Sequence, residues 1–227
     1  MKLGWQQIPS PVVSEILCNE FDGVVLDTEH GCYNNETIYS CNQVIKLSGK
    51  KSFVRLTEVN KTLIRYCLDS GVDGLIFSTV ENVSQCEKII EYSFYPPLGK
   101  RGLGLVRQNG WGEKKLLANP PIIVAQIETK QAIDNLDLIK NYNFDFYLIG
   151  PYDLSLSLGD PGNFDSIDFS LHISKFNDII EKSKRAVHIP KDIHKNIKNY
   201  KNYGLMCLGM DTISILEYHR EIKNVGF

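Results

Sequence analysis

The most constraining feature of this 227-residue sequence is a repeated alternation of two kinds of segment. Short runs rich in β-branched and other apolar residues alternate with longer stretches that have the apolar spacing of an amphipathic helix. The expected strands are residues 5–8, 23–26, 52–56, 74–78, 122–127, 146–150, 186–189 and 206–209. The expected helices are residues 11–19, 37–47, 61–70, 83–92, 130–141, 169–182, 192–203 and 213–222. This order implies parallel strands joined by right-handed crossovers.

Two architectures satisfy this alternation, namely a doubly wound open sheet and a closed (β/α)8 barrel. The count of eight favours the barrel, and the strands lack the glycine-rich first turn of a dinucleotide-binding fold. No linker, low-complexity tract or long repeat divides the chain. We therefore expect an α/β protein made of a single (β/α)8 TIM barrel domain over residues 1–227.

Composition limits the cellular setting and the partners. Lys and Arg number 25 against 27 Asp and Glu, which gives a net charge of −2 and argues against a nucleic-acid-binding protein. The six cysteines form no Cys-x-x-Cys pair, so we expect a reduced, cytoplasmic protein rather than a zinc ribbon. The sequence shows neither a signal peptide nor an apolar run long enough for a membrane helix, so no membrane partner is expected.

Polar residues gather where several expected strands end. The active site of a (β/α)8 barrel lies at the carboxyl ends of its strands. An acid, a base, an arginine and two further carboxylates fall at or just after these ends: Glu29, His30, Arg55, Glu128 and Asp153. We therefore expect them to converge on one rim of the barrel.

The fifth expected strand indicates which of its faces is interior. Positions 123, 125 and 127 are all apolar and should pack against helices, which turns Gln126 and Glu128 into the barrel. Asp153 follows the neighbouring strand and could lie about 5 Å away. Two such carboxylates suit a hard divalent cation that keeps several waters. Each could instead cap the helix that follows it.

Five strings then occur in a fixed order: FDGVVLDTEHG, FVRLTEVNKTLIRYCLDSGVDGLIF, YPPLGKRGLGLVRQNGWG, VAQIET and LIGPYDLSLSLG. They resemble the metal-dependent pyruvate aldolases of the HpcH/HpaI group, from residue 3 to about residue 211. The resemblance implies a barrel of the phosphoenolpyruvate/pyruvate type that reversibly cleaves a 4-hydroxy-2-oxo acid to pyruvate and an aldehyde. It also implies a homo-oligomer, a hexamer built as a trimer of dimers.

The resemblance further implies a role for each matching residue. Glu128 and Asp153 would hold Mg²⁺, Mn²⁺ or Co²⁺, a Lewis acid for the oxo acid as it becomes a pyruvate enolate. Arg55 would contact the carbonyl and the enolate, while His30 would act as acid and base with Asp69 as its partner. The other residues expected to bind substrate stand beside these motifs: Gln126, Gly150, Pro151 and Tyr152.

The chain departs from the family pattern at two places. Gly31 follows the histidine where many members have alanine, and Phe77-Ser78-Thr79 replaces a common Val-Pro-Met. The identity of the aldehyde half of the substrate is therefore left open.

The position of Asp69 bears on the subunit arrangement. Asp69 ends a helix and should lie about 13 Å below the rim that carries His30. We therefore expect Asp69 to reach His30 from a neighbouring subunit.

Other interpretations of single residues remain open. Arg55 could form a structural bridge to Asp27 or Glu29, and His30 could be an ordinary loop histidine. The remaining histidines suit structural or surface positions, except that His188 falls inside the seventh expected strand. The basic residues of the glycine-rich segment 95–121, namely Lys100, Arg101 and Arg107, suggest a mobile cover.

Other functions are also possible. A lysine Schiff base is the rival aldolase chemistry, and Lys191 is its nearest candidate. A related barrel could act on phosphonopyruvate or a CoA thioester. A barrel that binds oxo acids without catalysis is a further alternative. Loss of one of the five residues to which the resemblance gives a role would support it, but all five are retained, namely His30, Arg55, Asp69, Glu128 and Asp153.

Overall fold

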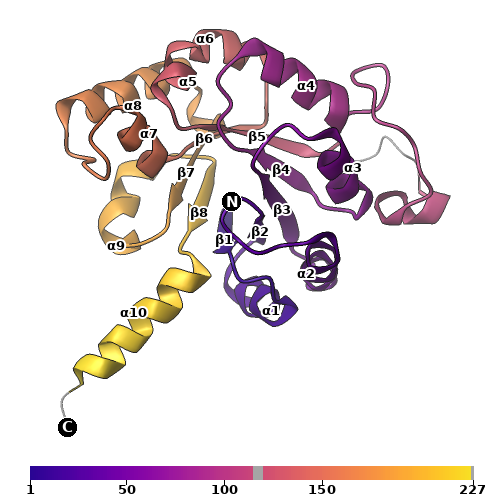
Figure 1. The fold of residues 1–227 in the computed structure, drawn as a ribbon, viewed down its shortest axis with the longest axis horizontal. Coiled ribbons are helices and arrows are strands. Elements are labelled where there is room, and N and C mark those ends of the chain that lie inside the picture. Colours follow the sequence, from indigo (N-terminus) through magenta and orange to yellow (C-terminus); the bar gives the residue numbers. More distant parts are fainter. Residues whose placement is uncertain (115–119, 226–227) are drawn as a thin grey trace.

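The computed structural model describes residues 1–114 and 120–225, and its eight parallel strands form a closed barrel in the order β1 to β8 (Figure 1). The strands are β1 Lys2–Gln6, β2 Gly23–Asp27, β3 Lys51–Leu56, β4 Gly74–Phe77, β5 Ile122–Ile127, β6 Phe146–Ile149, β7 Arg185–Ile189 and β8 Leu205–Leu208. The α-helices are α1 Pro11–Glu20, α2 Asn35–Leu47, α3 Lys61–Asp69, α4 Val83–Ser93, α5 Lys130–Asp134, α6 Leu136–Ile139, α7 Pro151–Ser157, α8 Ile167–Ile179, α9 Ile193–Asn196 and α10 Asp211–Asn224. Short 3-10 turns are η1 Arg107–Gly112, η2 Lys140–Tyr142, η3 Lys182–Lys184 and η4 Ile197–Tyr200. The expected (β/α)8 TIM barrel is confirmed.

Strand β1 lies earlier in the chain than expected. Its first residues pair with both neighbours, since Leu3 is in register with Gly23 of β2 and with Cys207 of β8. It ends at Gln6 because the next two backbone N–H groups, of residues 7 and 8, donate to the carboxylate of Asp211. A side chain distant in sequence therefore sets this boundary, which local periodicity does not record.

Three helical segments also differ from expectation. The helix expected over residues 130–141 breaks at Asn135, whose side-chain amide donates to the Glu81 carbonyl at 2.8 Å. The helix expected over residues 192–203 divides into α9 and η4. The short helix α7 is not among the helical ranges expected above, although a helix after Asp153 was one alternative; it begins earlier, at Pro151, a residue suited to a first helical position.

Two apolar layers surround the strands, one inside the barrel and one between the barrel and the helices. The inner layer includes Trp5, Phe53 and Val124, whereas Ile123 and Ile127 belong to the outer layer. The interior face of β5 is therefore the one that alternation indicated, and it carries Gln126 toward the barrel mouth.

The expectation that the basic segment forms a mobile cover is wrong for its described part. The segment leads from α4 into the amino end of β5, opposite the rim where the strands end. Arg101 is buried, and its guanidinium forms a 2.5 Å ion pair with the carboxylate of Asp69 and lies over the Tyr95 ring. These contacts anchor the segment to α3. Residues 115–119 lie outside the described residues.

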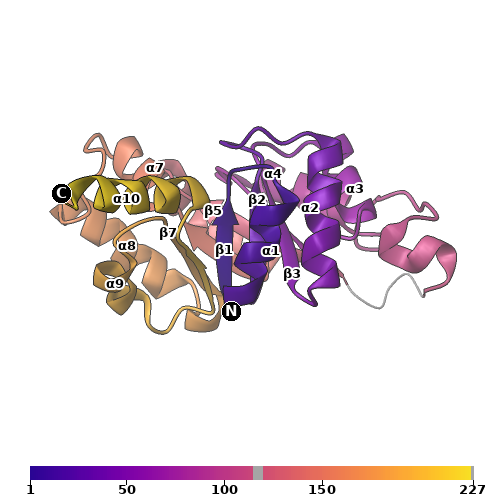
Figure 2. The same cartoon turned by 90° about the horizontal axis from the view of Figure 1, so that it is seen from below.

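Helix α10 extends away from the barrel in Figure 1, and in Figure 2 it is drawn in front of α7 and α8. Among the described residues, none of the helices combines the length and the apolar character needed to cross a membrane.

Candidate active site

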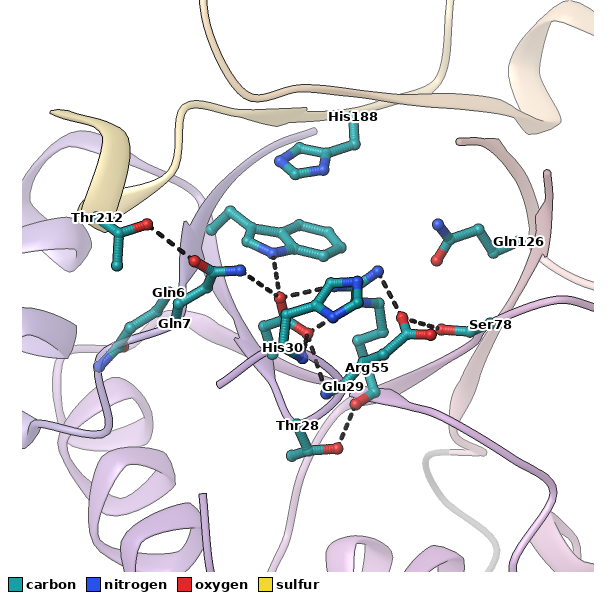
Figure 3. Close-up of polar contacts among 12 residues, drawn as sticks. Gln6, Gln7, Thr28, Glu29, His30, Arg55, Ser78, Gln126, His188 and Thr212 are labelled. Carbon is teal, nitrogen blue, oxygen red and sulfur yellow. Dashed lines mark hydrogen bonds and ion pairs between the residues drawn. The ribbon is translucent and has the colours of Figure 1, made fainter. Parts of the chain in front are cut away.

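The centre of the barrel mouth is an arginine held by two carboxylates. Asp27 and Arg55 are register partners at the carboxyl ends of β2 and β3, so they face the same side of the sheet. Arg55 Nε donates to Asp27 Oδ1 at 2.8 Å and Nη2 donates to Oδ2 at 2.7 Å, while Nη1 lies 2.6 Å from Glu29 Oε2. The bridge expected between these residues is present with both acids (Figure 3).

Burial and ion pairing together set the pKa values of Asp27 and Arg55. Asp27 is fully buried, which favours its neutral form, but the hydrogen bonds and charge of Arg55 prevail and lower the pKa of Asp27 to about 2. The indole N–H of Trp5 and the side-chain amide of Gln7 donate to the same carboxylate, at 3.0 and 3.2 Å. Burial also favours the neutral form of Arg55, which would lower its pKa. The hydrogen bonds and the charge of Asp27 outweigh burial and hold the pKa of Arg55 above its ordinary value. Both groups are therefore charged and fixed at neutral pH.

A buried carboxylate lies beyond the end of β5. Glu128 is 2% exposed, and its Oε1 accepts hydrogen bonds from Thr79 N at 2.7 Å and from Thr79 Oγ1 at 2.8 Å. Its other oxygen accepts from the side-chain amide of Gln126. Burial raises the pKa of Glu128 to about 7, and the negative charges of Asp153 and Glu29 act in the same direction. The donors that hold this acid are all neutral, so its negative charge lacks a directly bonded cation within the described chain.

The residues after β4 support both acids. Ser78 Oγ donates to Glu29 Oε2 at 2.7 Å, and Thr79 supplies both donors to Glu128 Oε1. Thr79 adopts a positive φ of 51°, which is strained for a β-branched residue. This strain is tolerated where the backbone N–H must point at a buried carboxylate.

Neither metal-binding candidate serves as a helix cap. The side chain of Thr129 caps α5 by accepting from Ala132 N, and Gly150 occupies the cap position of α7. Asp153 lies in the first turn of α7 and is exposed. The capping alternative is therefore wrong for Glu128 and Asp153.

Gly150 is required where β6 ends. A Cβ atom at Gly150 would lie 2.6 Å from Glu128 Oε2 and 3.0 Å from Gln126 Nε2. Pro151 and Tyr152 follow it at the start of α7, and Tyr152 packs edge-on against Phe164. The structure thus brings Gly150, at the end of β6, against Gln126 and Glu128 at the end of β5.

The donor set of this region fits a hard divalent cation. Glu128 and Asp153 supply two carboxylates whose mutual repulsion a cation would relieve, and Mg²⁺ typically binds through one or two carboxylates while retaining waters. The side-chain carbonyl oxygen of Gln126 is buried without a hydrogen-bond partner in the described chain, which leaves an acceptor free for a metal-bound water. Within residues 1–114 and 120–225, no group of three or more His, Cys, Asp or Glu side chains is placed to hold a metal ion.

His30 and Asp69 are not brought together within one chain. His30 is exposed just after β2, and its backbone N–H donates to Asp27 Oδ1 at 3.3 Å. Asp69 is the last residue of α3 and forms its ion pair with Arg101. In the described chain no hydrogen bond joins the two side chains.

Comparisons with known proteins identify the family. The sequence profile of the HpcH/HpaI aldolase/citrate lyase family matches residues 9–194. The chain belongs to this family. A 2-keto-3-deoxy-L-rhamnonate aldolase of Salmonella gallinarum is 33% identical over 167 residues, which cover 70% of this chain and 62% of that relative.

Solved structures extend the likeness to the fold. A family member from Burkholderia cenocepacia has a TM-score of 0.89 at 20% identity and covers 98% of this chain and 92% of its own. The citrate synthase SbnG has a TM-score of 0.85 at 25% identity and covers 97% of this chain and 90% of its own. The HpcH/HpaI barrel thus extends over nearly the whole chain.

Sequence reasoning missed several residues that support the site. Trp5 in β1 and Gln7 just after it donate to Asp27 in β2, and Thr79 after β4 donates to Glu128 after β5. The departure of Phe77-Ser78-Thr79 from the family pattern was the available signal for Thr79. The contacts of Trp5 and Gln7 carried no local signal.

Proposed function

We propose that this HpcH/HpaI protein is a class II aldolase that cleaves a 4-hydroxy-2-oxo acid to pyruvate and an aldehyde with a divalent metal ion. The observation that carries the proposal is that Arg55, fixed by Asp27, and the buried carboxylate of Glu128 lie close enough for the charge of Glu128 to act on Arg55. The curated aldolase relative supports the same chemistry. The match spans 62% of the length of that relative.

Arg55 stabilises negative charge in this scheme. Cleavage of the bond between C3 and C4 leaves negative charge on the oxygen of the former 2-oxo group. The guanidinium is already oriented by Asp27 and Glu29, so it needs no reorganisation when that charge develops. The metal, held by Glu128 and Asp153, supplies Lewis-acid polarisation of the oxo acid when it is bound. Gln126 and the backbone from Gly150 to Tyr152 border the pyruvate half.

His30 takes the proton from the 4-hydroxyl group and returns a proton in the reverse reaction. A histidine suits this work because its ordinary pKa lies near neutrality. Asp69 assists it from a neighbouring subunit, which agrees with the absence of a bond between the two within the described chain.

Exposed apolar surface supports a homo-oligomer. Helix α10 leaves the barrel with Ile215, Leu216 and Tyr218 between 48% and 62% exposed. A second exposed apolar patch lies near Asp69. There Leu105 and Trp111 line a surface hollow and are 73% and 63% exposed. Patches of this kind mark interaction sites on soluble proteins, and a hexamer arranged as a trimer of dimers would cover them with other copies of the chain.

Metal binding and catalysis provide the test. Mn²⁺ titrated into chelator-treated protein should bind the wild type and bind Glu128→Gln weakly, with Glu81→Gln as the control. Retro-aldol activity should disappear with chelator and return with Mg²⁺, Mn²⁺ or Co²⁺. Full activity after exhaustive chelation, or borohydride trapping of pyruvate on Lys191, would overturn the proposal. Release of phosphate or of CoA would identify the related lyases, and metal binding without turnover would identify a binding protein.

A further inference from the structure

A cavity of about 380 Å³ lies beside the amino end of β5, away from the barrel mouth. It is bounded by the last residue of α4, by the segment that follows this helix, and by Pro120 and Pro121 just before β5. Its volume suits a small metabolite. The residues to which the proposed aldolase function gives a role do not line it, so it is a separate space.

Polar side-chain atoms without a hydrogen-bond partner in the described chain gather at this cavity. Four such buried atoms belong to residues that line it: Ser93 Oγ, Tyr95 Oη, Arg101 Nε and Arg101 Nη1. Elsewhere in residues 1–114 and 120–225 only two side-chain atoms share this state. Buried polar atoms in native proteins are nearly always paired. Their concentration at one cavity therefore indicates a ligand that supplies the missing partners.

The guanidinium of Arg101 is the strongest of these donors. The side chain is 1% exposed. Nη2 carries two hydrogens and lies 2.5 Å from Asp69 Oδ1 and 2.7 Å from Gln108 Oε1, so both of its hydrogens have acceptors. The three hydrogens on Nε and Nη1 have none in the described chain. A buried charged group requires partners for its remaining hydrogens, and the cavity is where a ligand could provide them.

The walls indicate a ligand with a carboxylate and an apolar body. Among the described residues that line the cavity, Arg101 alone is charged, and none is acidic. A carboxylate forms stronger hydrogen bonds with a guanidinium than a neutral acceptor does. The other walls include Phe94, Leu98 and four prolines, which present apolar surface to a ring or a short hydrocarbon chain.

We propose that this cavity binds a small monocarboxylic acid with an apolar body, whose carboxylate accepts hydrogen bonds from Arg101 and from the hydroxyl group of Tyr95. The guanidinium carbon of Arg101 lies 4.8 Å from the centroid of the Tyr95 ring, so the two donors border the same volume. The apolar body then packs against the prolines. The inference goes beyond the proposed aldolase function and does not depend on it.

The test uses two probes of nearly the same shape, 4-fluorobenzoate and 4-fluorobenzamide. Each is titrated into the purified protein without added metal, and binding is followed by fluorine NMR. Tyr95→Phe removes the hydroxyl group but keeps the ring beside Arg101, and Arg101→Gln removes the cation. Tyr92→Phe is the matched control, because Tyr92 lies in α4 but does not line the cavity. Arg55→Lys reports binding at the barrel mouth.

We expect the wild-type protein to bind the benzoate about tenfold more tightly than the benzamide, because hydrogen bonds between ionised groups are the stronger ones. Tyr95→Phe should weaken benzoate binding about tenfold, the effect of one hydrogen bond to a charged group, and Arg101→Gln should abolish it. Tyr92→Phe and Arg55→Lys should bind the benzoate as the wild type does. If Arg101→Gln fails to fold, the comparison of Tyr95→Phe with Tyr92→Phe decides.

Four results would overturn the inference. Absence of benzoate binding by the wild type would show that the cavity takes no such acid. Equal affinity for the two probes would exclude recognition of the carboxylate. Unchanged benzoate affinity in Tyr95→Phe would remove the hydroxyl group from the site. Loss of benzoate binding in Arg55→Lys would place the acid at the barrel mouth instead.

Discussion

Replacing Asp27 by Asn should destabilise the fold by a calculable amount. The carboxylate is fully buried, and one of its oxygens accepts from three donors, on Arg55, Trp5 and Gln7. An amide NH₂ placed there would face other donors, and Arg55 would keep Glu29 as its remaining partner. The difference between the ordinary pKa of 3.8 and the value of about 2 in the fold corresponds to about 2.5 kcal/mol. Removing one partner of a buried ion pair costs about 3–5 kcal/mol, so we expect a loss of about 2–4 kcal/mol at pH 7.

The pH dependence of stability separates this charge from simple packing. Because the folded-state pKa of Asp27 lies below its unfolded value, its contribution is complete above about pH 4 and disappears as pH falls toward about 2. Urea unfolding at fixed protein concentration, at pH 7, 4 and 3, should show the gap between wild type and Asp27→Asn narrowing with acid. Asp134→Asn breaks a surface ion pair with Lys175 and should cost less than about 1 kcal/mol. Equal stability of Asp27→Asn and wild type at pH 7, or parallel pH profiles, would refute the reasoning.

Three further predictions concern catalysis and assembly. Arg55→Lys should lower the single-turnover rate by about 10²–10³, because an ammonium cannot reproduce the guanidinium fork; an unchanged rate would return Arg55 to a structural role. His30→Ala and Asp69→Ala subunits, each inactive alone, should recover part of the activity when mixed and reassembled, and no recovery would refute a dyad across subunits. Gly150→Ala should weaken Mn²⁺ binding in a titration, because its methyl group would lie 2.6 Å from the buried carboxylate oxygen; wild-type affinity would show that this contact relaxes freely.

The barrel could be predicted because its strands and helices show the periodic spacing of apolar residues that is typical of each. In β5, the apolar positions Ile123 and Ile127 indicated the outer face, and Gln126 was placed inside by alternation alone. The element boundaries were less predictable, since β1 ends where two backbone N–H groups donate hydrogen bonds to the carboxylate of the distant Asp211. These hydrogen bonds form only in the closed barrel, so the sequence near β1 does not indicate them.

The site residues also fall into those that the sequence could predict and those that it could not. The pairing of Arg55 with Asp27 followed from strand ends and charge, because residues in register on parallel strands share a face. The role of Thr79 did not, because a β-branched residue is not expected at a φ of 51° until the surrounding fold imposes it. Arg101 was assigned to a mobile cover because a glycine-rich setting resembles a loop tip, whereas its ion pair with Asp69 buries it.

The charges at the mouth give a further reason to expect a metal ion. Arg55 is the positive group nearest the centre, and the carboxylates of Asp27 and Glu29 already contact it at 2.7 and 2.6 Å. Two acids for one base leave this cluster with an excess negative charge, to which Glu128 and Asp153 add. An oxo acid is itself an anion and would be repelled by such a field. A divalent cation held by Glu128 and Asp153 would offset the negative charge of these two carboxylates, so that Arg55 and the cation together attract the substrate carboxylate. Weak pyruvate binding by chelator-treated protein, strengthened by added Mg²⁺, is the expected consequence.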